Sequence, residues 1–307
     1  MLTPLRAIPF ESERVWGGSR LRPPRALPIG ELWVAGPWME VATGPHGGRT
    51  LEDLAAELGP ELVGSAAAVG PGPRFPLLVK LLDPVAWLSV QVHPDDTVAR
   101  MLAGPDAVGK AEVWYVVEAE PGAELLVGAR PNVRQADLRD AIRRGAPTAD
   151  LLARHVVEAG DAVVLPAGTL HAVGPGVLLY ELEQPSDLTY RVADWGRPAT
   201  PERPLHTAEA LASVVPESRP AVRRGGAAGR LARCAQFTLD LVDAPTRWSP
   251  EGRTLQVVTA VGAPLVMSGA GWVERLAPLD TLVVPASAGA WELQPGPGGR
   301  ALVAALP

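Results

Sequence analysis

Short apolar runs rich in β-branched residues recur along this chain of 307 residues, and turn residues separate them. Residues 76–93 and 156–194 contain such runs, and the 33 prolines and 32 glycines fall between apolar stretches throughout. Short apolar runs bounded by proline and glycine indicate strands rather than helices. The pattern therefore predicts an all-β protein with many turns.

A few segments depart from this pattern and are predicted to be helical. Thr50 can cap a short helix, and Asp53 lies near the N-terminus of that helix, where the helix dipole favours acidic side chains. Pro94 suits the first turn of a second helix. The predicted helical segments are 50–64, 94–103 and an insertion over 131–155.

Composition narrows the class of protein. Hydrophobic residues make up 47% of the chain, as in globular rather than disordered proteins. Cys234 is the only cysteine, so no disulfide can form within the chain. The formal charge of −6 argues against broad nucleic-acid binding, and any phosphate site must be a local cluster of cations. We find no signal peptide and no apolar run of about 18 residues, so we expect a cytoplasmic protein without a membrane segment.

The candidate chemistry begins with Gln91 and His93, two residues apart in the predicted strand LSVQVHPDD. Side chains two apart on a strand share a face, so both side chains and that of Ser89 project together. Glu112 follows in the strand-like run KAEVWYVVE, and His171 ends GDAVVLPAGTLH. Two histidines, one glutamate and one glutamine can form a ligand set for one divalent metal ion.

A single strand histidine is more often a hydrogen-bonded, half-buried residue than a ligand, so the spacing before His171 matters. Pro166 and Gly168 precede it. Proline restricts φ and glycine permits positive φ, so the turn can be sharp and can aim His171 inward. This spacing is similar to the second metal motif of the cupin β-barrels.

Four longer motifs follow in one order: LLVKLLDPVAWLSVQVHPDD, GKAEVWYVV, LPAGTLHAVG and ELEQPSDLTYRVADWGRP. Together with WGGSRL and PIGELWVA, they resemble the type I mannose-6-phosphate isomerases, in particular the short bacterial form. The resemblance runs from about residue 7 to residue 200. It implies a double cupin-type β-barrel, or jelly roll, with a small helical insertion. It also implies one Zn²⁺ per chain, with Gln91, His93, Glu112 and His171 as ligands.

The C-terminal region contains a degenerate repeat of the N-terminal region. Asp161-AVVL-Pro166 is echoed by Asp280-TLVV-Pro285, and Ala290 stands where the repeat would place a counterpart of His171. All five histidines precede residue 220, which excludes an imidazole-based site from the tail. We therefore predict a catalytic, metal-binding barrel at 1–200, a connector at 201–219 and a degenerate cupin-type β domain at 220–307.

The implied reaction interconverts mannose 6-phosphate and fructose 6-phosphate through a cis-enediol(ate), so one group must carry a proton and others must stabilise oxyanion charge. By the resemblance, Arg191 stabilises that charge and Glu181 is an active-site carboxylate. Lys110 shares a predicted strand face with Glu112 and could transfer a proton if the metal lowered its pKa. Asp187 is the second candidate for the base, ranked below Glu181.

For the phosphate we expect Ser89 and Lys80, on the ligand face and the adjoining strand, and Arg20 and Arg22 in WGGSRLR are alternatives. The expected partner is a small sugar phosphate, with neither nucleic acid nor membrane, and the expected state is a monomer or weak homo-oligomer. Three alternatives remain: an isomerase of another sugar phosphate, a non-catalytic sugar-binding cupin, and an Fe²⁺ dioxygenase. The last commonly has histidine where this chain has Gln91.

Overall fold

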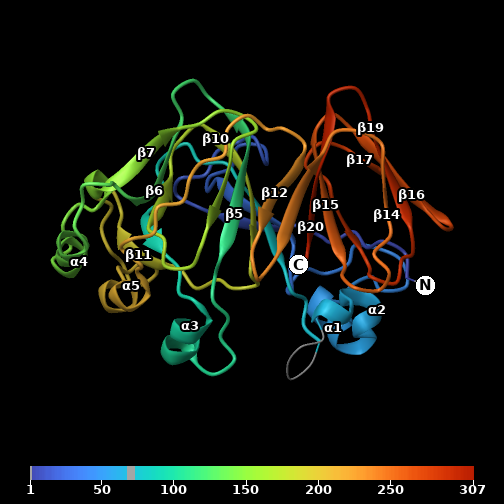
Figure 1. Cartoon of the computed structure of the whole chain (residues 1–307), viewed down its shortest axis with the longest axis horizontal. Coiled ribbons are helices and arrows are strands. Elements are labelled where there is room, and N and C mark those ends of the chain that lie inside the picture. Colours follow the sequence, from blue (N-terminus) through green and yellow to red (C-terminus); the bar gives the residue numbers. More distant parts are fainter. Residues whose placement is uncertain (1, 68–72) are drawn as a thin grey trace. The chain divides into compact units, whose positions relative to one another are not determined.

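The computed structural model describes residues 2–67 and 73–307, and strands in four sheets dominate it (Figure 1). The predicted all-β class is confirmed, with few and short helices. Among the described residues, each helix is too short or too polar to span a bilayer. The helices are α1 (Leu51–Leu58), α2 (Pro60–Val63), α3 (Asp96–Ala103), α4 (Gln135–Arg143) and α5 (Thr207–Ser213), with short 3₁₀ turns η1 (Ser65–Ala67) and η2 (Ala149–Leu151).

Two of the four sheets are formed by the first two thirds of the chain. One has six strands in the order β1 (Phe10–Glu13), β2 (Ile29–Ala35), β3 (Leu78–Leu82), β10 (Val177–Glu183), β5 (Glu112–Ala119) and β8 (Ala162–Leu165). The other has five strands in the order β11 (Tyr190–Ala193), β4 (Val90–Val92), β9 (His171–Val173), β6 (Glu124–Ala129) and β7 (Leu152–Val156).

The last third of the chain forms the other two sheets. The first has five strands in the order β12 (Gly229–Arg233), β13 (Thr238–Val242), β20 (Gly299–Ala305), β15 (Gln256–Gly262) and β18 (Thr281–Val284). The second has four strands in the order β14 (Thr246–Trp248), β19 (Trp291–Pro295), β16 (Leu265–Gly269) and β17 (Trp272–Leu276).

The sheets repeat one topology. The order β10-β5-β8 returns as β20-β15-β18, and β4-β9-β6-β7 returns as β14-β19-β16-β17. The two halves of the sequence repeat bracket β8 and β18, which are both edge strands. The degenerate sequence echo is therefore accompanied by a duplicated strand order.

By packing, the chain divides into two compact units. The first unit contains residues 1–11, 32–80 and 226–307, and the second contains residues 12–31 and 81–225. Residues 32–80 thus cluster with the C-terminal residues, although the sequence-based division assigns them to the N-terminal segment 1–200. As functional domains, the segments 1–200, 201–219 and 220–307 stay a prediction.

The sheet β11-β4-β9-β6-β7 shows how alternation positions the site. Val90 and Val92 lie on one face and share a core cluster with Leu138 of α4 and Ala210 of α5. Gln91, between the two valines, must therefore project from the opposite face. Leu125 on β6 belongs to the second core cluster of this unit, together with side chains of β5 and β8. Burial of each such large apolar side chain contributes about 1.5–3 kcal/mol to the free energy of unfolding.

The helix predictions are confirmed in part. Thr50 Oγ1 accepts a hydrogen bond from Asp53 N at 3.0 Å, as expected for a cap. The second helix begins later than predicted, because Asp95 caps it through Val98 N at 2.8 Å and Pro94 precedes the cap.

The prediction of helix up to residue 155 is wrong at its C-terminal end. Only α4 and a 3₁₀ turn are helical, and residues 152–156 form β7. Leu125 and Leu126 of β6 pair with this segment in antiparallel register. Pairing with a distant strand therefore outweighs the local helical pattern.

Candidate metal centre

Strand register sets Gln91 between two other polar side chains. Gln91 on β4 is the direct antiparallel partner of His171 on β9 and, on its other side, of Arg191 on β11. Directly opposed residues project from the same face of a sheet. Arg191, Gln91 and His171 therefore form a row across three strands.

A second polar group comes from β5 and β10 in the other sheet. Glu183 is the register partner of Glu112, and Glu181 is the partner of Trp114. Residues two apart on one strand share a face, so these four side chains project together. All four side chains are buried, and three of them are carboxylic acids.

Three of the predicted ligands meet in one cluster. Nε2 of His93 lies 3.5 Å from Oε2 of Glu112, and Nε2 of His171 lies 3.4 Å from Oε1 of the same carboxylate. The ligand atoms of the three residues all lie within 4.8 Å of one another, and the side chains are almost fully buried. A buried two-histidine, one-carboxylate cluster is a donor set for a divalent transition metal.

Both imidazoles are held in the tautomer that metal binding requires. Nδ1 of His93 lies 2.8 Å from the carbonyl oxygen of Leu188, and Nδ1 of His171 lies 2.9 Å from that of Thr169. Because a carbonyl oxygen only accepts hydrogen bonds, each Nδ1 carries the proton and each Nε2 presents a lone pair toward Glu112.

The turn before His171 also has the expected form. Gly168 has φ of 85°, and its amide donates to the carbonyl oxygen of His93 at 2.8 Å. This bond connects the two ligand-bearing segments directly. Burial lowers the pKa of His171 to about 4, so its imidazole is neutral at pH 7.

Gln91 lies at the edge of the cluster. Its Nε2 is 3.2 Å from Nε2 of His171, while its Oε1 accepts a hydrogen bond from Ser89 Oγ at 3.4 Å. A half-turn of the amide would exchange these two atoms and bring the oxygen, the usual amide ligand atom, beside His171. Ser89, predicted as a phosphate contact, therefore borders the ligand set in this structure.

Charge in the cluster is unbalanced without a cation. Glu112, Glu181 and Glu183 can place three buried ligand atoms within 4.8 Å of one another, and Lys110 is the amine among them. Lys110 Nζ lies 2.7 Å from Oε2 of Glu183 and 3.3 Å from Oε2 of Glu112. Fully ionised, these four groups carry a net charge of −2, which one divalent cation would neutralise.

This charge distribution shifts the pKa values of Glu112 and Lys110. Burial raises the pKa of Glu112 well above its usual range, and the neighbouring carboxylates add to the rise. Burial lowers the pKa of Lys110, but the three carboxylates, Glu183 above all, outweigh burial and hold that pKa well above its ordinary value. The lowered pKa expected for Lys110 depends on a bound metal ion, and it stays a prediction.

The two candidates for the base differ in their surroundings. Glu181 is buried, and its Oε1 accepts a hydrogen bond from Trp114 Nε1 at 2.8 Å. Asp187 lies exposed in the loop before β11. The contacts therefore favour Glu181, whose carboxylate is held in one orientation.

Arg191 is held in place by residues of the segment that follows β11. Its Nη1 donates to the carbonyl oxygen of Pro204 at 2.7 Å, and its backbone amide donates to Nδ1 of His206 at 3.1 Å. Its Nε is buried and makes no hydrogen bond within the described part of the chain. Burial lowers the pKa of the guanidinium, and the nearby Arg203 adds to the lowering.

Lys80 belongs to the first unit. It is buried on β3, with its ammonium 4.4 Å from the centre of the Trp33 ring. Arg20, which the WGGSRL motif offered as an alternative cation for the phosphate, instead forms an ion pair with the buried Asp83 at 2.6 Å.

Two residues of the cluster were not among the predicted site residues. Trp114 orients Glu181, and Glu183 is the shortest ion-pair partner of Lys110. Spacing was the available signal, because Trp114 follows Glu112 by two residues and Glu183 follows Glu181 by two. Which of these neighbours enters the cluster depends on the pairing of β5 with β10.

Comparison with known proteins places these features in a family. The model of the type I phosphomannose isomerase catalytic domain matches residues 16–113. The "Probable mannose-6-phosphate isomerase GmuF" of Bacillus subtilis is 37% identical over 222 residues, covering 69% of this chain and 68% of that protein. The mannose-6-phosphate isomerase of Streptococcus mutans is 39% identical over 194 residues, covering 60% and 58%.

Similarity in structure extends further than similarity in sequence. The crystal structure of the mannose 6-phosphate isomerase from Bacillus subtilis matches with a TM-score of 0.81 and 26% identity over 99% of both chains. The C-terminal residues, beyond most of the sequence resemblance, therefore share its fold.

Proposed function

This chain belongs to the type I mannose-6-phosphate isomerase family, and from that premise we propose that it interconverts mannose 6-phosphate and fructose 6-phosphate as a zinc-dependent aldose–ketose isomerase. The observation that carries the proposal is the buried cluster of His93, Glu112 and His171, with both Nε2 lone pairs directed at one carboxylate.

One Zn²⁺ per chain fits the cluster. His93, Glu112 and His171 would hold it, with Gln91 as the fourth ligand after a half-turn of its amide. Zinc suits two imidazoles with oxygen ligands, although the donor set also accommodates Mn²⁺, Fe²⁺ or Co²⁺. When bound, the ion supplies Lewis-acid polarisation of the substrate oxygens.

The protein side chains supply proton transfer and charge stabilisation. Glu181, oriented by Trp114, is the proposed base that moves the proton between C2 and C1 through a cis-enediol(ate). Asp187 stays the weaker candidate. Lys110, held cationic among carboxylates, and Arg191, on the ligand face of its sheet, would stabilise negative charge on the substrate oxygens. Ser89 and Lys80 are the proposed phosphate contacts.

For the fold, we propose that each duplicated pair of sheets is a cupin-type jelly roll, so that the chain is a double cupin. The repeated strand order supports this proposal. The proposed metal ligands all belong to the N-terminal copy, and all five histidines precede residue 220.

The test is turnover of mannose 6-phosphate by the purified protein before chelation, after chelation and after addition of Zn²⁺. We expect activity to be lost on chelation and restored by Zn²⁺. Activity that survives complete metal removal contradicts the metal assignment. Metal bound at one per chain with no turnover would instead favour another sugar phosphate or a binding role, and metal-dependent O₂ consumption would favour a dioxygenase.

A pair of histidine variants tests the site itself. His171→Ala should lose both metal and turnover, because it removes one of two imidazole ligands. His155→Ala is the matched control, since His155 lies on β7 in the same unit and outside the cluster. Equal metal content in both variants would show that the ligands are misassigned.

A further inference from the structure

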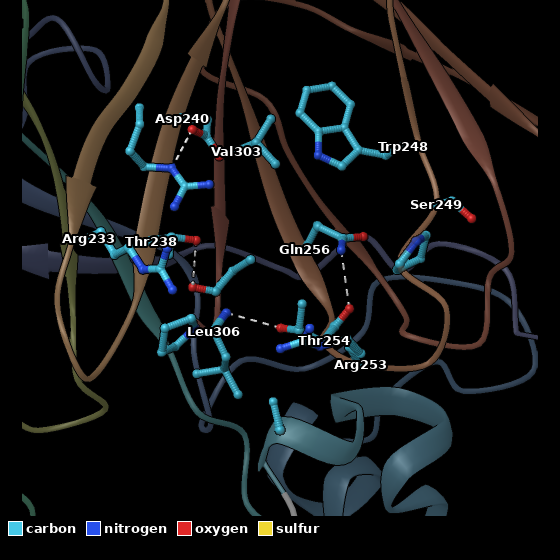
Figure 2. A pocket seen from close by; sticks show the side chains of 15 residues that line it. Arg233, Thr238, Asp240, Trp248, Ser249, Arg253, Thr254, Gln256, Val303 and Leu306 are labelled. Atoms are coloured by element: carbon cyan, nitrogen blue, oxygen red, sulfur yellow. Dashed lines mark hydrogen bonds and ion pairs between the residues drawn. The ribbon is translucent and has the colours of Figure 1, made fainter.

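The first unit contains a cavity of about 320 Å³ whose lining is cationic (Figure 2). Arg230 and Arg233 reach it from β12, and Arg253 reaches it from the loop before β15. Asp240 is the one acidic side chain in the lining. Its volume lies at the lower end of the range of about 300–1,000 Å³ typical of small-molecule sites.

A bulge in β12 brings two of these arginines to one face. Arg230 pairs with Asp240, and Arg233 pairs with Thr238, with a register shift between residues 230 and 232. In a regular strand, residues three apart project from opposite faces. The bulge inserts one residue, so both arginines follow Asp240 and Thr238, which are two apart and share a face.

The same face continues across the sheet. Val303 and Ala305 of β20 pair with Asp240 and Thr238, and Gln256 of β15 pairs with Ala305. All of these residues line the cavity. The cavity therefore lies against one continuous sheet face, and residues 249–250, 253–254 and 306–307 add to its lining.

The charges in this cavity are not balanced within the protein. Asp240 Oδ1 accepts a hydrogen bond from Arg230 Nε at 2.6 Å, which engages the acid with one arginine. Arg233 and Arg253 form no ion pair and no side-chain hydrogen bond with any residue of 2–67 or 73–307. In a chain with a formal charge of −6, this is a local surplus of positive charge.

The floor of the cavity is held in one arrangement. Trp291 Nε1 donates to Gln256 Oε1 at 3.2 Å. Gln256 Nε2 donates to the carbonyl oxygen of Thr254 at 3.2 Å (Figure 2). The Trp248 ring stacks on Trp291 with 4.9 Å between centroids. The polar floor is thus already satisfied, and Arg233 and Arg253 are the cationic groups that a ligand can engage.

The duplicated topology gives this cavity the same place in its unit that the metal centre has in the second unit. Glu112 begins β5 and pairs with Glu183, the last residue of β10. In the copy, Gln256 begins β15 and pairs with Ala305, the last residue of β20. The carboxylates of one unit are replaced by neutral residues in the other, and arginines have been added.

We propose that this cavity is a second ligand site, which binds phosphate, either free or as the monoester of a small polyol. The planar guanidinium fork matches phosphate oxygens and forms charge-assisted hydrogen bonds with them. The degenerate copy has therefore kept the position of a binding site and exchanged a cation-binding set of residues for an anion-binding set.

Calorimetric titration of the purified protein with inorganic phosphate tests the site. Replacing Arg233 and Arg253 together by Gln should weaken one saturable binding step at least tenfold. Arg247→Gln is the matched control, because Arg247 is an exposed arginine on β14 of the same unit, pairs with Glu292 and lies outside the lining. It should leave that step unchanged.

Titrations with sorbitol 6-phosphate and with neutral sorbitol distinguish a phosphate monoester from free phosphate as the ligand. Tighter, arginine-dependent binding of sorbitol 6-phosphate than of phosphate assigns a monoester, and equal binding assigns free phosphate. No saturable phosphate binding by the wild-type protein, or identical titrations for the double variant and Arg247→Gln, overturns the proposal. Mannose 6-phosphate turnover and the thermal midpoint of the double variant report whether it is folded.

Discussion

At the scale of single residues, two buried tryptophans perform the same task in the two units. Trp114 Nε1 donates to Glu181, and Trp291 Nε1 donates to Gln256. Both rings are about 1% exposed. The two residues allow one substitution to be made in matched environments, of which only one contains the proposed catalytic carboxylate.

Trp114→Phe should lower kcat about 10- to 100-fold with little change in KM, because a hydrogen bond to a charged group contributes about 1.5–3 kcal/mol. Both substitutions should lower the thermal midpoint by a similar amount, but Trp291→Phe should leave kcat unchanged. Steady-state kinetics and thermal unfolding of both variants provide the measurement. Equal effects on kcat would mean that Trp114 acts only through stability.

Glu183 provides a second test at this scale, since it lies 2.7 Å from Lys110 and next to the ligand Glu112. Glu183→Gln removes one negative charge from the cluster and should weaken metal binding about 10- to 100-fold, as for other groups that support ligands. Competition with a chelator measures the affinity. Glu118→Gln, at an exposed position on β5, should bind metal as the wild type does.

At the scale of elements, the segment after β11 is held together by the carboxylate of Asp194, which bonds to two arginines. Asp194 Oδ1 accepts from Arg197 Nη2 at 2.6 Å and from Arg203 Nη2 at 2.9 Å. Burial alone would raise the pKa of Asp194, but the hydrogen bonds from Arg203 and Arg197 outweigh it and lower that pKa. The same segment carries Pro204 and His206, which contact Arg191.

The lowered pKa of Asp194 determines the sign of a pH effect. The contribution of this group to stability is present above its unfolded pKa of about 3.9 and is lost as pH falls through the lower folded value. Asp194→Asn should therefore lower the thermal midpoint at pH 7, with a difference from wild type that shrinks below about pH 4. Exposed Asp187→Asn is the control, and a pH-independent difference would contradict the ion-pair explanation.

At the scale of the whole molecule, the ligands belong to one unit, so metal should stabilise that unit. Binding at about 1,000 times the dissociation constant adds about 4 kcal/mol to the free energy of unfolding. Hydrogen exchange of metal-free and zinc-loaded protein should show added protection in β4, β5, β9 and β10. Protection gained instead in β15 and β20 would locate the metal in the other unit.

The sequence by itself determined the all-β class and several local features. Proline and glycine mark the turns, Thr50 caps its helix, and Gly168 adopts the positive φ expected before His171. It also identified His93, Glu112 and His171, which the structure brings together. These features depend on the conformational preferences of neighbouring residues, and the family motifs contain the ligands.

Only the tertiary structure decided which distant residues meet. The pairing of β5 with β10 brings Glu183 to Lys110, and this carboxylate raises the pKa of the lysine. Pairing with β6 makes residues 152–156 a strand, and the bulge in β12 turns Arg230 and Arg233 to one face. Strand register and buried charge depend on residues far apart in the chain, and local sequence preferences do not specify such contacts.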